Sequence, residues 1–361
     1  MRRAKTFIAF TVVLGGLLMS SCNKHSINVP QSNDPVFKAE GTIDANQFEL
    51  VAGDDNAFMF TSIESKNNVP IYSGKLSNGD LSIEIGIYDG LIDIPGHNVI
   101  NSMPSELIFS RKTTSPIAFL SKESFPNADI IDHVSWSVDG LDSLNTMTIY
   151  EPGKYQVCAD IVFSDGSSNV LCSELILGYA RHANFQIKHF LNQNGTLTAW
   201  VEDPQVAVEK IKWYLDDVLI SSDAELTYNQ LSDENHILRA DVSFENGVKR
   251  SKNMIVDGSL GGKFIDDLTF FETGTLALLH RDFNIRLKLV QDGITFSSDQ
   301  TNNSLNTVSF SDVSYYAKDA NGNDVYKVKA HVVATVIDVQ NVNGSRQLEF
   351  DTTFGIAIPK D

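Results

Sequence analysis

The stretch "YQVCADIVFSDGSSNVLC", which runs from Tyr155 to Cys172, predicts a β-hairpin. Its first arm alternates apolar and polar residues with a period of two, as a strand with one buried face does. The segment "SDG", residues 164–166, suits a three-residue hairpin loop in which Gly166 takes the left-handed conformation. The stretch therefore contains two antiparallel strands and the loop that joins them.

The loop length fixes which residues of this hairpin face each other. A three-residue loop pairs Phe163 with Ser167, and counting five residues along each arm places Cys158 opposite Cys172. Directly opposed residues of an antiparallel pair lie about 4.5–5.5 Å apart between Cα atoms, which is within reach of a disulfide. These are two of the chain's 3 cysteines. They form a staple, a metal site, a redox pair or a reactive thiol with a neighbour, depending on the compartment.

The same alternation recurs along the rest of the chain. The length of 361 residues is enough for two to four domains. Hydrophobic residues make up 42% of the chain, which is typical of a globular protein. Further alternating runs occupy residues 81–90, 236–244, 283–290 and 325–339. Asn-Gly and Asp-Gly dipeptides separate such runs, and no amphipathic helix longer than two turns stands out. The sequence therefore predicts an all-β protein.

The central part of the chain contains an internal repeat. "VSWSVDG" at residues 134–140 matches "IKWYLDD" at 211–217, and "CADIVFSDGSS" at 158–168 matches "RADVSFENGVK" at 239–249. The first pair of segments is offset by 77 residues and the second by 81, which one loop insertion explains. Two units of this length, each with an early tryptophan and a late hairpin, predict tandem β-sandwich modules.

The first of these units resembles a PKD domain, an Ig-like β-sandwich of bacterial surface proteins. In that family an early tryptophan precedes a turn with Gly or Asp, and a Pro-Gly-x-Tyr turn starts the strand of a closing hairpin. The matching positions are Trp136, Asp139, Gly140, Pro152, Gly153 and Tyr155. The second unit keeps Trp213 and Asp216 but lacks the Pro-Gly turn. The resemblance covers about residues 128–258; it implies a fold with both tryptophans in the core and says little about activity.

The flanks of the repeat read as two further β domains, which gives four modules in a row. The predicted boundaries are a signal peptide at 1–22, a flexible tether at 23–35, an N-terminal β domain at 36–127, a PKD-like domain at 128–180, a second Ig/PKD-like domain at 181–258 and a C-terminal β-sandwich at 263–361.

The N-terminus carries an export signal. Basic residues precede the apolar stretch of residues 7–20, which is shorter than the roughly 20 residues that a spanning helix needs. "LLMSSC" then resembles a bacterial lipobox that ends at Cys22. The resemblance implies a lipid on Cys22 and an outer-membrane address, on the periplasmic or cell-surface face; the alternative is an ordinary cleaved signal peptide. Export to an oxidising compartment predicts that Cys158 and Cys172 form a disulfide on the outward face of the hairpin.

No stretch nominates catalytic or metal-binding residues. The sequence has no H-E-x-x-H, C-x-x-C or G-x-S-x-G motif, and no pair of carboxylates can be assigned. We therefore expect neither an enzyme nor a cofactor. The acidic loops at 53–57 and 319–324 leave a Ca²⁺ ion as the alternative, although the second lacks the glycine and glutamate of a calcium loop.

The candidate binding residues are aromatic. Trp200 has no counterpart in the repeat, so it either packs within the fold or stacks on a sugar ring. Tyr315 and Tyr316 point to opposite faces of one strand, so that one of them faces outward or into an interface. The net charge of −18 excludes nucleic acid as a partner. We expect a non-enzymatic cell-envelope lipoprotein that binds protein or glycan in adhesion. The alternatives are a carbohydrate-binding accessory lipoprotein of a glycan-uptake system and a surface hydrolase with its active site in a flanking domain.

Overall fold

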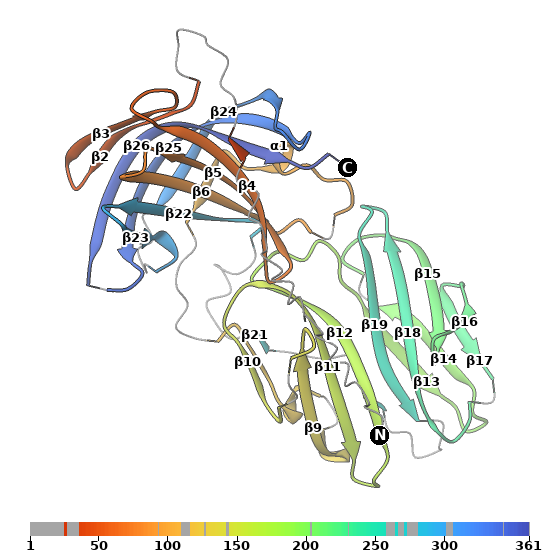
Figure 1. The fold of residues 1–361 in the computed structure, drawn as a ribbon. Helices are drawn as coiled ribbons and strands as arrows, with labels where there is room; N and C mark the ends of the chain where they lie inside the picture. The colour runs from red at the N-terminus through yellow and green to blue at the C-terminus, as the bar shows by residue number, and fades with distance from the viewer. Residues whose placement is uncertain are drawn as a thin grey trace, which may run out of the picture.

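The computed structural model describes residues 25–26, 36–109, 116–257, 264–265, 271–272, 281–300 and 306–360, except residues 93, 126–127, 142–143, 203, 230 and 342. Cys22 and the predicted signal peptide lie outside the described residues. The described part is all-β, as predicted, apart from one helical turn, α1 (Val99–Ser102), and short 3-10 turns. None of its helices is long and apolar enough to cross a membrane. A large curved sheet stands beside a pair of smaller β-sandwiches (Figure 1).

The large domain is built on one antiparallel 12-stranded sheet. Its strands are β1 (His25–Ser26), β2 (Lys38–Ile43), β3 (Asn46–Val51), β4 (Phe58–Lys66), β5 (Val69–Ser77), β6 (Leu81–Asp89), β7 (Glu106–Ile108), β22 (Phe283–Gln291), β23 (Ile294–Ser297), β24 (Thr307–Lys318), β25 (Asp324–Asp338) and β26 (Ser345–Ile358). They follow the order β1-β4-β5-β6-β22-β23-β25-β26-β2-β3, and β24 pairs with β25 and β7.

This sheet corrects the prediction of two separate flanking domains at 36–127 and 263–361. Strand β6 pairs with β22 along all 9 residues of β22, and β26 pairs with β2. One hydrophobic core takes residues from both flanks. Each flank alone would leave apolar faces and strand edges uncovered, and the two flanks cover each other. The two sandwiches are therefore an insertion between β7 and β22, rather than the middle of a row of four modules.

The two ends of this insertion lie close together. Arg281 Nη1 donates a hydrogen bond to the carbonyl oxygen of Ile108 at 3.2 Å, and Phe109 forms an isolated bridge with Ile285. The chain thus leaves the large domain and returns to it at almost the same place.

The curved sheet folds back on itself, so that β26 packs across β4 and β5. A glycine permits the closest approach of its two halves. A Cβ atom at Gly74 would lie 2.3 Å from the backbone oxygen of Gly355, a distance that no side chain could occupy.

Part of the predicted tether at 23–35 is a strand. In β1, His25 pairs with Thr61 and Ser26 with Phe60, both of β4. Strand β4 otherwise ends the sheet, and its unpaired backbone groups bind the N-terminal segment.

The first sandwich has two three-stranded sheets, β10-β8-β21 and β12-β11-β9. Its strands are β8 (Ala118–Leu120), β9 (Ile131–Val138), β10 (Met147–Ile149), β11 (Gly153–Phe163), β12 (Ser168–Leu177) and β21 (Phe271–Glu272). The predicted boundaries of 128–180 are too narrow, because β8 and Ile117 belong to this core and β21 comes from the predicted C-terminal domain.

The hairpin of β11 and β12 has the predicted register. The Phe163 N–H donates to the Ser167 carbonyl oxygen at 2.8 Å, and Gly166 has a φ of 87°. Cys158 faces Cys172, and the two form the predicted disulfide with a Cα–Cα distance of 4.1 Å.

The second sandwich has a three-stranded sheet, β13-β14-β17, and a five-stranded sheet, β16-β15-β18-β19-β20. Its strands are β13 (Gln186–Leu191), β14 (Leu197–Glu202), β15 (Val208–Leu215), β16 (Val218–Ser221), β17 (Glu225–Tyr228), β18 (Asn235–Phe244), β19 (Lys249–Asp257) and β20 (Phe264–Ile265). Arg239 faces Asn253 where the first module has its disulfide. Trp136 and Trp213 are fully buried in the two cores, as the resemblance implied.

The Pro-Gly turn of the first sandwich contacts the large domain. The turn between β4 and β5 lies against it: the Lys154 N–H donates to the Asn67 carbonyl oxygen at 2.9 Å, and Asn67 Nδ2 donates to the Pro152 carbonyl oxygen at 3.1 Å. A Cβ atom at Gly153 would lie 2.4 Å from the Cβ of Asn67. Glycine is therefore required here by the contact between the domains.

Replacing both Cys158 and Cys172 by alanine is expected to lower the free energy of unfolding of the first sandwich by about 2–3 kcal/mol. The bond joins residues with a sequence separation of 14, and its loss enlarges the ensemble of unfolded conformations. Hydrogen exchange of β11 and β12 amides as a function of urea measures the change, with β18 as the internal control. Equal protection with and without the disulfide would contradict the prediction.

Candidate functional site

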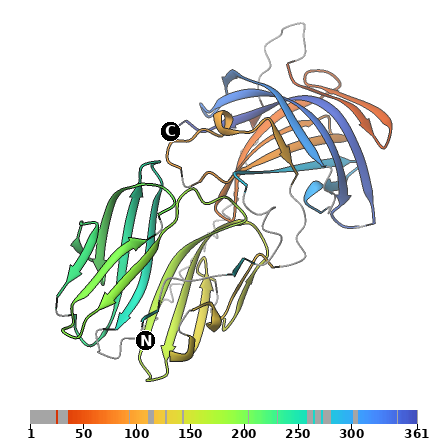
Figure 2. The same cartoon turned by 180° about the vertical axis from the view of Figure 1, so that it is seen from behind.

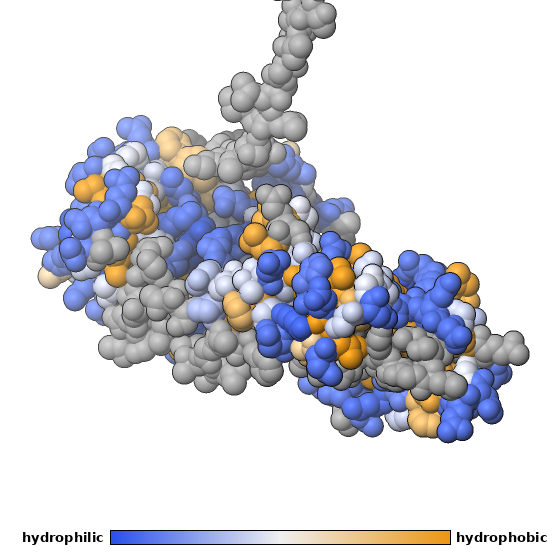
Figure 3. All heavy atoms as spheres, turned by 90° about the horizontal axis from the view of Figure 1, so that it is seen from below, coloured by the Kyte–Doolittle hydropathy of each residue, from blue (hydrophilic) through white to orange (hydrophobic). Residues whose placement is uncertain are grey.

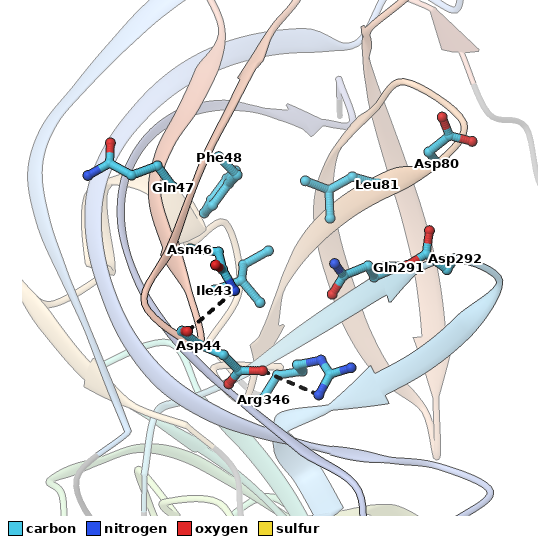
Figure 4. Close-up of a pocket in the computed structure, with 10 residues that line it drawn as sticks. All are labelled: Ile43, Asp44, Asn46, Gln47, Phe48, Asp80, Leu81, Gln291, Asp292 and Arg346. Atoms are coloured by element: carbon cyan, nitrogen blue, oxygen red, sulfur yellow. Dashed lines mark hydrogen bonds and ion pairs between the residues drawn. The ribbon is translucent and has the colours of Figure 1, made fainter.

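The hairpin turns at one end of the large domain surround an open pocket, which we call the mouth pocket (Figure 4). It has a volume of about 370 Å³. Its lining comes from the β2–β3, β5–β6 and β22–β23 hairpins and the start of β26: Ile43, Asp44, Asn46, Gln47, Phe48, Asp80, Leu81, Gln291, Asp292 and Arg346.

The middle of the mouth pocket is apolar. The side chains of Ile43, Phe48 and Leu81 lie together there (Figure 4). Ile43 belongs to the core of the large domain, and the other two pack against that core while remaining half-exposed. The Phe48 ring lies edge-on to Phe350, with 5.9 Å between the ring centroids. The pocket is thus the accessible end of the hydrophobic core.

Charged and amide groups surround this apolar floor. Arg346 Nη1 lies 3.3 Å from Asp44 Oδ2, and Asp44 Oδ1 accepts the Gln347 N–H at 2.8 Å, so the carboxylate is held in place. Gln291 points inward (Figure 4), and its Oε1 atom is buried without a hydrogen-bond donor among the described residues. Donors and acceptors are therefore held around an apolar centre.

Local turn geometry positions these groups. Asp44 and Ala45 have φ values of 49° and 64°, and Asp292 and Gly293 have 52° and 77°. Two consecutive left-handed residues are typical of the tight two-residue hairpin turn that matches the twist of a sheet. The Asp292–Gly293 dipeptide is a turn signal in the sequence, but no signal brings it next to Asp44.

The three aromatic residues predicted to bind ligand do not come together. Trp200 lies on β14 between Lys188 and Glu225 of the neighbouring strands, and 36% of its surface is exposed. Tyr315 and Tyr316 face opposite sides of β24, as predicted: the first is exposed, and the second packs edge-on against Phe37. None of the three lines the mouth pocket.

A serine, a histidine and an aspartate of the second sandwich are linked by a chain of two hydrogen bonds. Ser232 Oγ is 2.7 Å from His236 Nε2, and His236 Nδ1 is 2.6 Å from Asp216 Oδ2. This connectivity is that of a hydrolase triad. The sequence does not reveal this arrangement, because three common residue types at these spacings form no motif.

The repeat indicates a structural role for this arrangement. His236 corresponds to Tyr155, and Ser232 to Glu151, each 81 residues earlier. In the first sandwich Tyr155 donates to the Glu151 carbonyl oxygen at 2.7 Å, and burial raises the pKa of Tyr155 so that its hydroxyl stays protonated. The histidine therefore makes the corner contact that a tyrosine makes in the other copy.

The aspartates of the two copies act alike. Asp139 Oδ1 accepts the Gln156 N–H at 2.9 Å, and Asp216 Oδ1 accepts the Ile237 N–H at 2.9 Å. Each carboxylate closes the turn after its tryptophan strand. In the first copy, Asp139 closes this turn without a histidine beside it. The same structural role accounts for Asp216 in the second copy, so no catalytic role is needed to explain it.

In the acidic loop at 319–324, N–H groups of the loop itself bind the carboxylate of Asp319. Asp319 Oδ1 accepts the Asn321 and Asn323 N–H groups at 2.8 and 2.9 Å. Within the described ranges, no three His, Cys, Asp or Glu side chains are grouped so as to hold a metal ion.

The molecular surface seen from below is mostly hydrophilic, and its hydrophobic residues form small groups between the polar ones (Figure 3). On this face the described residues therefore offer no broad apolar surface for a protein partner.

No family model matches the chain, and no curated protein matches it. Among solved structures, the fibronectin(III)-like modules of CbhA from Clostridium thermocellum are similar to 43% of this chain and 90% of theirs, at 15% sequence identity and a TM-score of 0.17. A likeness of this size carries no argument about function. The chain's own sheets define it as an all-β protein in which two Ig-like β-sandwiches are inserted into a larger β domain.

Proposed function

We propose that this protein is a non-enzymatic, lipid-anchored protein of the cell envelope that binds a glycan in the mouth pocket. The observation that supports the proposal is the apolar floor within a ring of held carboxylate, guanidinium and amide groups. A sugar has an apolar C–H face and an edge of hydroxyl groups, which suit such a floor and such a ring. The volume of about 370 Å³ lies within the roughly 300–1,000 Å³ of small-molecule sites.

A glycan is favoured over a protein partner by the shape of the site. Protein interfaces bury a broad surface around aromatic anchors, whereas the mouth pocket is small and concave. The role would be adhesion to glycan or support of a glycan-uptake system. A hydrolase is less well supported, because the Ser232–His236–Asp216 arrangement has a non-catalytic counterpart in the first sandwich.

The double variant Gln291→Ala, Asp292→Asn is expected to lower glycan affinity about tenfold, because it removes the Gln291 amide and replaces the charged acceptor of Asp292 by a neutral amide, and each change costs about 0.5–1.5 kcal/mol. Asparagine preserves the left-handed turn at position 292. A glycan array identifies the ligand with the chain that lacks residues 1–22, and calorimetry compares the variants. Asp165→Asn, in an exposed turn of the first sandwich, is the matched control. Undiminished binding by the double variant, or no glycan bound by the parent chain, would refute the proposal.

Cys22→Ala is expected to abolish incorporation of labelled palmitate into the protein, because the lipobox-like segment presents this cysteine for acylation. Each buried CH₂ of an acyl chain contributes about 0.8 kcal/mol to membrane binding, so the variant should also leave the membrane fraction. The double variant Cys158→Ala, Cys172→Ala should keep its label. Labelled Cys22→Ala protein would show that the anchor lies elsewhere.

A further inference from the structure

The mouth pocket carries an excess of negative charge. Three carboxylates line it, those of Asp44, Asp80 and Asp292. The one cation among its lining residues, Arg346, is already engaged, because its Nη1 lies 3.3 Å from Asp44 Oδ2 and its Cζ lies 5.1 Å from the centroid of the Phe296 ring. This pair is balanced, so the charges of the other two carboxylates remain.

These two carboxylates, of Asp80 and Asp292, are exposed and lie in neighbouring turns. Within the part of the chain that the structure describes, neither side chain makes a hydrogen bond or an ion pair. The Asp292 N–H donates to the Asp80 carbonyl oxygen at 3.2 Å, which joins the β22–β23 turn to the β5–β6 turn. Both residues lie on the same side of the pocket as Gln291 (Figure 4). Two like charges are thus held near each other at one side of the mouth pocket, where a cation would relieve their repulsion.

The amide groups of the pocket add to the acceptors rather than to the donors. Gln291 Oε1 is buried and accepts no hydrogen bond from the described residues. Asn46 Nδ2 donates to the Asp44 carbonyl oxygen at 3.5 Å, and the Gln47 side chain points away from the pocket (Figure 4). The unpartnered acceptors of the pocket therefore favour a ligand that supplies hydrogen-bond donors.

The mouth pocket is remote from the two sandwiches. Asn67, in the turn at one end of β5, contacts the first sandwich, whereas Asp80, in the turn at the other end, lines the pocket. Strand β5 has 9 residues, so about 30 Å separates the two turns. The sandwiches pack side by side, with β12 of the first next to β19 of the second, and none of their residues lines the pocket (Figure 2). A polymeric ligand in the pocket therefore meets neither sandwich there.

An amino group on a sugar supplies what the pocket lacks. The proposed function places a sugar ring on the apolar floor, and the present inference rests on that proposal. A protonated amino group beside the ring has three N–H donors and one positive charge. Its hydrogen bonds to carboxylates are charge-assisted and roughly twice as strong as those of a neutral hydroxyl group.

Other charged ligands fit less well. An acidic sugar would add a third negative charge to the two that are already unpaired. A metal ion would need more ligands, and among the described residues no three His, Cys, Asp or Glu side chains are grouped to hold one. A basic peptide has the charge but lacks the flat C–H face of a sugar ring, which suits the floor of Ile43, Phe48 and Leu81.

We propose that the mouth pocket selects a glycan whose sugars carry free amino groups. Asp80 and Asp292 bind the ammonium group and so discriminate between amino sugars and neutral sugars. The apolar floor binds the ring in either case.

The test compares three oligosaccharides of equal length and the same β-1,4 linkage, built from glucosamine, N-acetylglucosamine or glucose. They differ only in the group on carbon 2. Calorimetry uses the chain without residues 1–22 at mildly acidic pH, where the amine is protonated. The glucosamine oligomer is expected to bind about tenfold or more tightly than either neutral oligomer. The preference should shrink at 1 M salt, where charges are screened beyond roughly 3 Å.

Asp80→Asn with Asp292→Asn is expected to weaken binding of the glucosamine oligomer most, so that the three affinities converge. Asparagine is accepted at position 292, where φ is 52°. The matched control is Asp54→Asn with Asp55→Asn, in the exposed turn beyond the far end of β3. It makes the same change of charge in the same domain and should keep the preference. Thermal melting establishes that both variants are folded.

The outcomes separate this inference from the proposed function. Equal affinity of the parent chain for the glucosamine and glucose oligomers would overturn the inference and leave a glycan-binding pocket standing. A preference that survives in the Asp80 and Asp292 variant, or that the control loses equally, would also overturn it. So would equally tight binding of trilysine, which would show that charge alone is recognised. Failure of the parent chain to bind any glycan would overturn both proposals.

Discussion

Residues 36–109 and residues 281–361 are each expected to stay unfolded when expressed alone, whereas the two joined by a short flexible linker are expected to fold. Strands β6 and β22 supply each other's hydrogen bonds, and the core of the large domain takes residues from both segments. Each half of the sheet alone exposes both its apolar face and an unpaired edge. The burial and hydrogen bonds that would offset the loss of chain entropy on folding are then missing. Circular dichroism and amide hydrogen exchange distinguish the three chains.

The linker can be short because the ends of the insertion are in contact, with 3.2 Å between Arg281 Nη1 and the Ile108 carbonyl oxygen. The matched control joins residues 36–109 to 306–361 by the same linker and so lacks β22 and β23. It should remain unfolded. Cooperative unfolding of either segment by itself would show that the flanks are independent domains after all.

Trp213→Ala is expected to destabilise the second sandwich by about 3–5 kcal/mol, which approaches the whole stability of a small domain. The side chain is fully buried, and its Nε1 donates to the Asp223 carbonyl oxygen at 3.1 Å. The substitution leaves a large cavity and an unpaired carbonyl group. Hydrogen exchange of β15 and β18 in increasing urea measures the loss.

Phenylalanine in place of each tryptophan separates the cavity from the hydrogen bond. Trp136 stacks on Phe125 with 5.4 Å between ring centroids, and its Nε1 is buried without a hydrogen-bond acceptor in the described part of the chain. Trp136→Phe therefore removes no hydrogen bond and should cost less than Trp213→Phe. The reverse order would contradict this account.

Local sequence was sufficient to predict the hairpin at the centre of the first sandwich. The glycine at 166 fixed the loop, the loop fixed the register, and the register placed Cys158 opposite Cys172. Each step spans only a few residues, over which turn geometry and side-chain alternation determine the structure.

The strand pairing of the large domain could not be predicted from local sequence. Alternation shows that residues 81–89 and 283–291 are strands, but it carries no information about which strand pairs with which. The mouth pocket depends on the same long-range pairing, since Asp44, Gln291 and Arg346 come from hairpins far apart in the chain. Trp200 could be singled out from the sequence because it has no counterpart in the repeat, but neither its exposure nor its distance from the residues of the mouth pocket could be predicted.

The packing of β12 against β19 also bears on solubility. A strand edge with free N–H and C=O groups recruits other strands and leads to aggregation, and proteins commonly protect such edges with charges, bulges or a covering segment. Here the Asn253 amide of β19 donates a hydrogen bond to the Cys172 carbonyl oxygen of β12, the edge strand of its sheet, while β20 pairs with β19 at Ile255 and Val256. The second copy of the repeat thus covers part of the strand edge that the first copy exposes.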